Sequence, residues 1–160
     1  MTTIGITGHS NLSAATQALV GDEIRAVLRP YASTGLVGIT CLGRGADQIF
    51  AQIVLELGGA IEAVIPAADY VSGIREPADR RRVDEFIANA RAVHELPFAA
   101  SGPDAYFAAS KELINRSDRL IVVWDGSPPD GRGGTADAVG YASKTGRKVT
   151  VVWPPNSKRT

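Results

Sequence analysis

The sequence predicts one α/β domain over residues 1–160, with a doubly wound, mainly parallel sheet of five strands and helices on both faces. Two observations lead to this fold class. Short β-branched runs alternate with longer segments of helical periodicity, which is the pattern of parallel strands joined by crossover helices. The composition, with 44% hydrophobic and 21% charged residues, is that of a globular domain long enough to bury a core.

The five expected strands are apolar runs bounded by glycine, proline or polar residues. They cover residues 4–7, 36–42, 60–66, 120–124 and 148–153. Helices are expected at about 13–30, 46–57, 76–92, 104–115 and 135–145. Right-handed crossovers favour the strand order 3-2-1-4-5. Residues 155–160 are expected to form a disordered tail.

Charge and cysteine content narrow the function classes. Lysine plus arginine equals aspartate plus glutamate at 17 each, so the net charge is zero and non-specific binding to nucleic acid is disfavoured. The single cysteine, Cys41, cannot form an internal disulfide, and no cysteine or histidine cluster indicates a metal site. The first residues are typical of a strand rather than a signal peptide, and no apolar run has membrane-spanning length. We therefore expect a cytoplasmic protein without a membrane partner.

Three glycine-rich loops follow the first, second and fourth expected strands. They are residues 7–13 (TGHSNLS), 42–47 (LGRGAD) and the start of 125–142 (DGSPPDGRGGTADAVGYA). In the predicted strand order these loops meet at the switch point of the sheet, where open α/β sheets bind ligands. Glycine permits close approach of the backbone to a ligand, and the following helix N-termini attract anions. A single glycine-rich loop commonly does no more than end a strand, but three such loops at one place predict a phosphate-bearing ligand.

The common nucleotide fingerprints are incomplete. Gly43 and Gly45 begin a dinucleotide motif, but Gln48 stands where its third glycine belongs, and the second strand does not end in an acidic residue. The run GITCLGRG has the spacing of a P-loop, yet Arg44 and Gly45 replace its lysine and its Ser/Thr. NAD chemistry and ATP hydrolysis are therefore poorly supported, and no cofactor is required.

Four motifs in this order carry a resemblance that spans residues 4–154. GITGHSNL, GRGADQIFAQIVLELGGAIEAVIP, SDRLIVVWDG and GGTADAVGYA together resemble the SLOG superfamily of Rossmann-like nucleotide-binding proteins. That superfamily includes the LONELY GUY (lysine decarboxylase-like) phosphoribohydrolases and the Smf-type DNA-processing proteins. The resemblance implies a Rossmann-like fold in which the glycine-rich loops hold the phosphate and sugar of a nucleotide or a nucleotide-derived signal.

Departures from these families shape the functional hypothesis. The phosphoribohydrolases carry PGGxGTxxE with a catalytic glutamate; this chain keeps Gly134 and Thr135 but has Ala138 at the glutamate position. Asp137 is one residue early, which turns it about 100° away on a helix. We therefore expect a binding or sensor module, and no catalytic residue is assigned. The alternatives are a nucleoside 5′-monophosphate phosphoribohydrolase and a single-strand nucleic-acid binder of the DNA-processing type, whose SGLARGID motif is CLGRGAD here.

The predicted ligand site consists of residues from the three loops. They are Gly8, His9, Gly43, Arg44, Gly45, Asp47, Asp125, Gly126, Arg132, Gly133, Gly134 and Thr135. Arg44, followed by Arg132, is the best candidate for a charge-assisted phosphate contact. Thr135 either caps its helix or binds phosphate, and Asp47 either caps its helix or faces a sugar. A nucleotide ligand and a homodimer are the expected partners, whereas nucleic acid is disfavoured.

Other candidates have simpler interpretations. Tyr70 either stacks on a base or packs under the segment 67–118, and packing is favoured. The charged run 79–85 is interpreted as a solvated helix face, because its charges alternate in sign. His94 is interpreted as structural or exposed.

Overall fold

The computed structural model describes residues 1–129, 131 and 133–160. Within these residues the chain forms one six-stranded, fully parallel sheet in the order β4-β3-β2-β1-β5-β6. The strands are β1 (Thr2–Gly8), β2 (Leu36–Thr40), β3 (Ala60–Ile65), β4 (Ala92–Glu95), β5 (Arg119–Val123) and β6 (Lys148–Val152). The helices are α1 (Ala14–Leu28), α2 (Ala46–Glu56), α3 (Pro77–Asn89), α4 (Pro103–Asn115) and α5 (Thr135–Lys144), with a 3₁₀ turn at Arg29–Tyr31.

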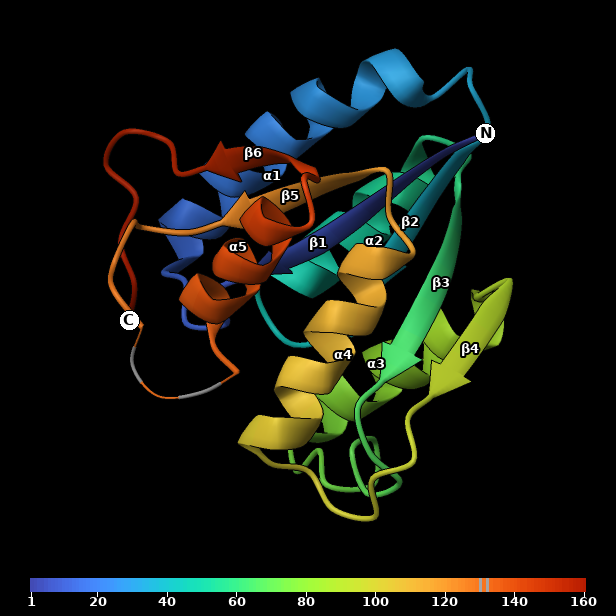
Figure 1. Ribbon diagram of the computed structural model, residues 1–160. Coiled ribbons are helices and arrows are strands. Elements are labelled where there is room, and N and C mark those ends of the chain that lie inside the picture. Colours follow the sequence, from blue (N-terminus) through green and yellow to red (C-terminus); the bar gives the residue numbers. More distant parts are fainter. Residues whose placement is uncertain (130, 132) are drawn as a thin grey trace.

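Helices cover both faces of the sheet, as the sequence predicts. Helices α4 and α5 lie in front of the sheet in Figure 1, and α1 and α2 lie behind it. The central strands alternate their side chains between two cores: Ile121 and Val123 face α1, α2 and α3, whereas Leu120 and Val122 face α4 and α5. No helix in the described part of the chain is long and apolar enough to cross a membrane.

The prediction of five strands in the order 3-2-1-4-5 is wrong, because a sixth strand extends the sheet. Strand β4 pairs with β3, with Glu62 opposite Ala92, and forms one edge. The expected helix 76–92 instead ends at Asn89. Strand β4 has four residues and alternates half-buried with exposed positions, leaving Val93 46% exposed. An edge strand buried on one side needs no apolar run, so it lacks the signal that marks the other strands.

The C-terminal residues, expected to be a disordered tail, pack against the loop that follows β1. Lys158 N donates to Thr16 Oγ1 at 2.7 Å, and Thr160 N donates to Asn11 O at 2.8 Å. Arg159 forms an antiparallel bridge with Leu12, and its Nε donates to Asn11 Oδ1 at 2.9 Å. These contacts bring the Arg159 side chain to the same edge of the sheet as the three glycine-rich loops.

Candidate ligand-binding crevice

The loops after β1, β2 and β5 meet at the carboxyl edge of the sheet. The loop after β1 lies between the other two: His9 N donates to Val123 O at the end of β5 (3.0 Å), and Ala46 N at the start of α2 donates to His9 O (3.3 Å). The predicted switch point is therefore present at β1: strands β2, β3 and β4 follow on one side of it, and β5 and β6 lie on the other side.

Three of the predicted glycines are required by the close packing of these loops. A Cβ on Gly8 would lie 2.7 Å from Val123 O, one on Gly45 2.7 Å from His9 O, and one on Gly133 2.6 Å from Pro103 O. Gly45 and Gly133 also have φ values of +75° and +85°. Gly134 differs from all three, because its φ is −84° and a Cβ there would meet no atom of the described residues within 4 Å. The fold itself therefore gives no reason for glycine at position 134.

Three adjoining hollows form a crevice along this edge. The α5 hollow, of about 300 Å³, is lined by Gly8, His9, Gly133, Gly134, Thr135 and Arg159 among others. The central pocket, of about 140 Å³, is lined by Thr7, Gly8, Cys41, Asp47, Tyr70, Tyr106, Ser110 and Gly133 among others. The outer pocket, of about 600 Å³, is lined by Gly43, Arg44, Asp69, Tyr70, Arg75, Asp79, Ser101 and Tyr106 among others. Shared residues at each boundary make the three hollows continuous.

The α5 hollow contains the start of helix α5. Gly134 is the N-cap residue, and none of the side chains that the structure describes caps the helix. Thr135 is the first helical residue rather than the cap, so its hydroxyl remains near the hollow. The N–H groups of the first helical turn have no acceptor within the helix and give this end partial positive charge. Asp137 Oδ2 accepts the Gly133 N–H at 2.8 Å, which holds the loop in place but adds a negative charge nearby.

His9, Asp125 and Arg159 form a polar group beside the α5 hollow. His9 Nε2 lies 3.1 Å from Asp125 N and 3.0 Å from Asp125 Oδ1. A neutral ring accepts from the N–H, whereas a protonated ring donates to the carboxylate. Burial lowers the pKa of His9 and outweighs the hydrogen bond with Asp125, so the neutral ring is favoured. Arg159 Nη1 lies 3.6 Å from Asp125 Oδ2, and hydrogen bonds from Ser127 together with His9 hold the pKa of Asp125 below its usual range.

The central pocket contains a carboxyl group in an apolar setting. Asp47 Oδ2 accepts the Gly43 N–H at 3.0 Å, so Asp47 closes its own loop rather than capping α2. Burial raises the pKa of Asp47 to about 7, against the opposing effect of that hydrogen bond. Burial also raises the pKa of Cys41, which keeps it a thiol that packs among apolar neighbours.

The end of β2 is strained. Leu42 has a φ of +62°, which is unusual for a residue with a branched side chain. Two neighbours stabilise this conformation: Thr40 Oγ1 accepts the Leu42 N–H at 3.0 Å, and Gln48 Nε2 donates to Leu42 O at 3.2 Å. The turn directs the following Gly43 towards the crevice, where a Cβ would lie 3.1 Å from Asp47 Oδ2.

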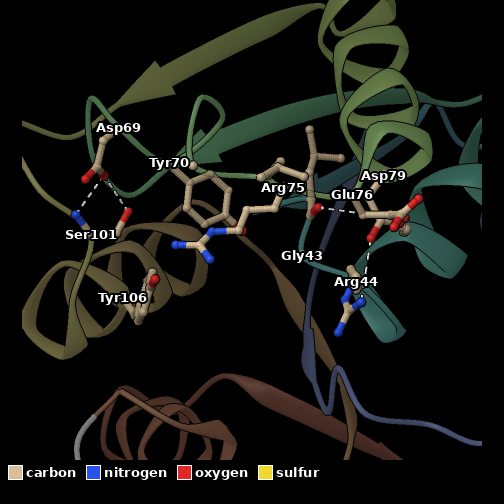
Figure 2. Close-up of a pocket in the computed structure, with 13 residues that line it drawn as sticks. Gly43, Arg44, Asp69, Tyr70, Arg75, Glu76, Asp79, Ser101 and Tyr106 are labelled. Carbon is tan, nitrogen blue, oxygen red and sulfur yellow. Dashed lines mark hydrogen bonds and ion pairs between the residues drawn. The ribbon is translucent and has the colours of Figure 1, made fainter.

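Figure 2 shows the outer pocket between the loop after β2 and the segment after β3. Tyr70 and Tyr106 are in edge-to-face contact with ring centroids 6.4 Å apart. Asp69 Oδ1 accepts from both N and Oγ of Ser101, at 2.8 and 2.7 Å, and so joins the segment after β3 to the one before α4. Arg44 is 68% exposed and lies 3.7 Å from Asp79 on helix α3.

The predicted residues divide into three groups by location. Gly8, His9, Gly133, Gly134 and Thr135 line the α5 hollow, whereas Gly43 and Arg44 line the outer pocket and Asp47 the central one. Gly45 and Gly126 do not line the crevice; Gly126 has a φ of +83° in a turn. Arg132 lies outside the described residues.

Sequence reasoning missed Arg159, Arg75, Tyr106 and the Asp69–Ser101 pair. Tyr106 lies in a helix whose pattern is ordinary, and Arg159 lies in a segment without periodicity, so neither has a local signal. The described residues contain no group of three His, Cys, Asp or Glu side chains able to hold a metal ion.

The fold is Rossmann-like, as the motifs indicate, and solved structures share it. Neither sequence-family models nor curated proteins match the chain. The solved structure of DNA processing protein A from Streptococcus pneumoniae is similar, with a TM-score of 0.71 and 18% identity over 98% of this chain and 52% of that one. This chain therefore spans about half the length of the pneumococcal protein.

Two further structures share the fold. One describes the single-stranded DNA binding mode of DNA processing protein A from Helicobacter pylori, with a TM-score of 0.71, 17% identity, and coverage of 99% of this chain and 68% of that one. The other is the molybdenum cofactor binding protein from Rippkaea orientalis, with a TM-score of 0.59, 16% identity, and coverage of 94% and 75%. At these identities the likeness establishes the fold alone.

Proposed function

We propose that this protein binds a nucleotide, or a nucleotide-derived phosphate ligand, in the crevice and acts as a binding or sensor module. The observation that supports this most directly is Gly134. Neither its backbone conformation nor its surroundings require glycine, and it opens into the α5 hollow at the uncapped start of α5. A missing side chain at that position leaves the backbone N–H groups of the helix accessible to a phosphate.

The rest of the crevice suits the remainder of such a ligand. Arg159 supplies a positive charge beside the α5 hollow, and the tyrosine pair Tyr70 and Tyr106 supplies aromatic surface at the other end. Ligand sites in proteins are typically concave, partly apolar, and equipped with a few converging polar groups. The crevice combines these features at the topological switch point.

Hydrolysis is a weaker hypothesis for this chain. Ala138, at the position of the phosphoribohydrolase glutamate, is fully buried in the core formed with α4 and β5. A carboxylate substituted there would have to be desolvated, which costs several kcal/mol in most proteins. Asp137 is engaged by the Gly133 N–H. We therefore favour ligand binding over hydrolysis as the function of this chain.

Single-stranded nucleic acid is the second candidate, and the extended shape of the crevice favours it. Two of the three arginines that line its described part face carboxylates: Arg44 lies 3.7 Å from Asp79 and Arg159 lies 3.6 Å from Asp125, whereas Arg75 has no ion pair among the described residues. A polyanion needs an excess of positive charge along its path. This local neutralisation makes a mononucleotide the better fit.

Calorimetric titration with a panel of nucleoside mono-, di- and triphosphates tests the proposal, with the matching unphosphorylated nucleosides as controls. We expect at least one phosphorylated compound to bind in preference to its nucleoside, without release of free base. Oligonucleotide binding that weakens steeply with salt, and no binding of mononucleotides, would favour the second candidate. Rapid release of base would overturn the preference for a binding module.

A further inference from the structure

The central pocket has a polar lining suited to a small hydroxylated group. Asp47 Oδ2 accepts the Gly43 N–H, but Asp47 Oδ1 has no hydrogen-bond partner among the residues that the structure describes, and the carboxyl group lines the pocket. The Tyr70 hydroxyl is likewise without a partner within the described ranges. Both groups lie at Gly43: a Cβ there would be 3.1 Å from Asp47 Oδ2 and 3.6 Å from the Tyr70 hydroxyl.

The size and position of the pocket limit what it can hold. Its volume is about 140 Å³, which corresponds to a few water molecules at roughly 30 Å³ each and to one small ring. Gly8 and Gly133 join it to the α5 hollow, and Tyr70 and Tyr106 join it to the outer pocket. The order along the crevice is thus an anion-attracting end, a small polar compartment and a larger aromatic compartment.

The three parts of a nucleotide follow one another in the same order. A phosphate in the central pocket would face the Asp47 carboxyl group, and the described residues that line this pocket include no positive side chain. A purine or pyrimidine ring matches the larger aromatic compartment better. A sugar hydroxyl, in contrast, can donate to Asp47 Oδ1 and accept from the Tyr70 hydroxyl.

We propose that the central pocket is a ribose subsite in which Asp47 accepts a hydrogen bond from a sugar hydroxyl, so that the protein selects ribonucleotides over deoxyribonucleotides. This inference rests on the proposed nucleotide-binding function and adds the sugar class to it. A bound deoxyribonucleotide would cover the Asp47 carboxyl group without supplying a hydroxyl partner, and an unsatisfied acceptor costs free energy. The protein therefore selects against the deoxy form as well as for the ribose form.

Burial supports this assignment by raising the pKa of both groups. The Tyr70 hydroxyl remains protonated and able to donate, because burial holds its pKa above the usual range. Burial raises the pKa of Asp47 to about 7, although the residue keeps some solvent exposure, and a bound sugar would cover the carboxyl group further. The titratable groups that act on Tyr70 are Cys41, Asp47 and Tyr106, and all three raise its pKa; Asp47 is affected by burial and by the Gly43 N–H.

The test compares each nucleoside 5′-monophosphate with its 2′-deoxy and 3′-deoxy forms by calorimetry, in the wild type and two variants. The wild type is expected to bind the ribonucleotide about tenfold or more tightly than at least one deoxy form. Asp47→Asn keeps the size of the side chain and an acceptor for the Gly43 N–H, yet is expected to reduce this ratio to about threefold or less.

Asp137→Asn is the matched control. Asp137 makes the equivalent bond to Gly133 N at the start of α5, but it lines the α5 hollow rather than the central pocket. This variant is expected to change the affinity for all phosphates together and to leave the ribose-to-deoxyribose ratio as in the wild type. Thermal unfolding of each variant confirms that it is folded.

The outcomes separate this inference from the function on which it rests. If the wild type binds nucleotides but treats ribose and deoxyribose alike, or if Asp47→Asn retains the full ratio, the ribose subsite is refuted and the proposed function stands. If the wild type binds no phosphate-bearing probe, both are refuted. An equal loss of the ratio in Asp47→Asn and Asp137→Asn would show an indirect effect of loop structure and would also refute the subsite.

Discussion

Arg159 Nη1 lies 3.6 Å from Asp125 Oδ2, so a residue near the C-terminus is paired with the carboxylate that follows β5, beside the α5 hollow. The pair is loose, and the Arg159 side chain is 40% exposed. An incoming phosphate can therefore replace Asp125 as the partner of Arg159 at little cost.

Arg159→Ala is predicted to weaken binding of a phosphorylated ligand by about 1.5–3 kcal/mol, the range for a hydrogen bond to a charged group. Arg44→Ala is the matched control and is predicted to have a smaller effect, because Arg44 is 68% exposed and lines the outer pocket rather than the α5 hollow. Calorimetric titration of both variants gives the comparison. A larger loss in the Arg44 variant would place the phosphate in the outer pocket instead.

Gly134→Val is predicted to abolish ligand binding and to leave the thermal unfolding of the unliganded protein nearly unchanged. The new side chain would enter open space at a φ of −84°, which valine adopts without strain, but it would cover the start of α5. Gly133→Val is the contrasting variant, since its Cβ would meet Pro103 O at 2.6 Å and its φ is +85°. That variant is expected to unfold at a clearly lower temperature. Unchanged affinity in Gly134→Val would contradict the phosphate site.

The raised pKa of Asp47 predicts a pH-dependent stability. Burial raises this pKa from 3.8 to about 7, so the folded state holds the proton more tightly than the unfolded state. The contribution of Asp47 to the free energy of unfolding is therefore highest below pH about 4 and declines as the pH rises to about 7. Asp47→Asn is expected to remove this decline. Urea unfolding at several pH values measures it, and parallel curves for the two proteins would argue against a raised pKa.

The pKa of His9 is predicted to respond in opposite directions to its two charged neighbours. Burial lowers this pKa below 6.5, the hydrogen bond with Asp125 opposes that effect, and the charge of Arg159 adds to it. Asp125→Asn should thus lower the pKa further, and Arg159→Ala should raise it. Titration of the His9 ring by NMR provides the measurement. Shifts of the same sign in both variants would be inconsistent with the described geometry.

The five strands expected from sequence are all in the sheet. Four of them are apolar runs that are largely buried, and β6, an edge strand that is mostly exposed, is marked by its β-branched residues. Strand β4 was missed because its four residues, alternately half-buried and exposed, are too few to be distinguished from the helical segments around them. Strand β6 is an edge strand too, but its five residues KVTVV include four β-branched residues, whereas AVHE in β4 has one.

The candidate site was only partly predictable. The glycine motifs locate the three loops, but they do not distinguish Gly133, which packing requires, from Gly134, which it does not. That distinction depends on Pro103, which is remote in sequence. The same holds for Arg159 and Tyr106, whose positions at the crevice follow from tertiary contacts rather than from any spacing within their own segments.

Central strands support one end of the crevice, and connections of the edge strand support the other, so the two ends differ in how freely their specificity can change. The anion-attracting end rests on β1 and β5, in the middle of the sheet, where a change in one loop disturbs its neighbours. The outer pocket rests instead on connections to and from the edge strand β4, joined by the Asp69–Ser101 contact. Insertions or substitutions in residues 68–76 and 97–102 can therefore alter which ligands fit while the central sheet and the anion-attracting end stay intact. Libraries that seek new ligand preferences on this scaffold are best confined to those two segments.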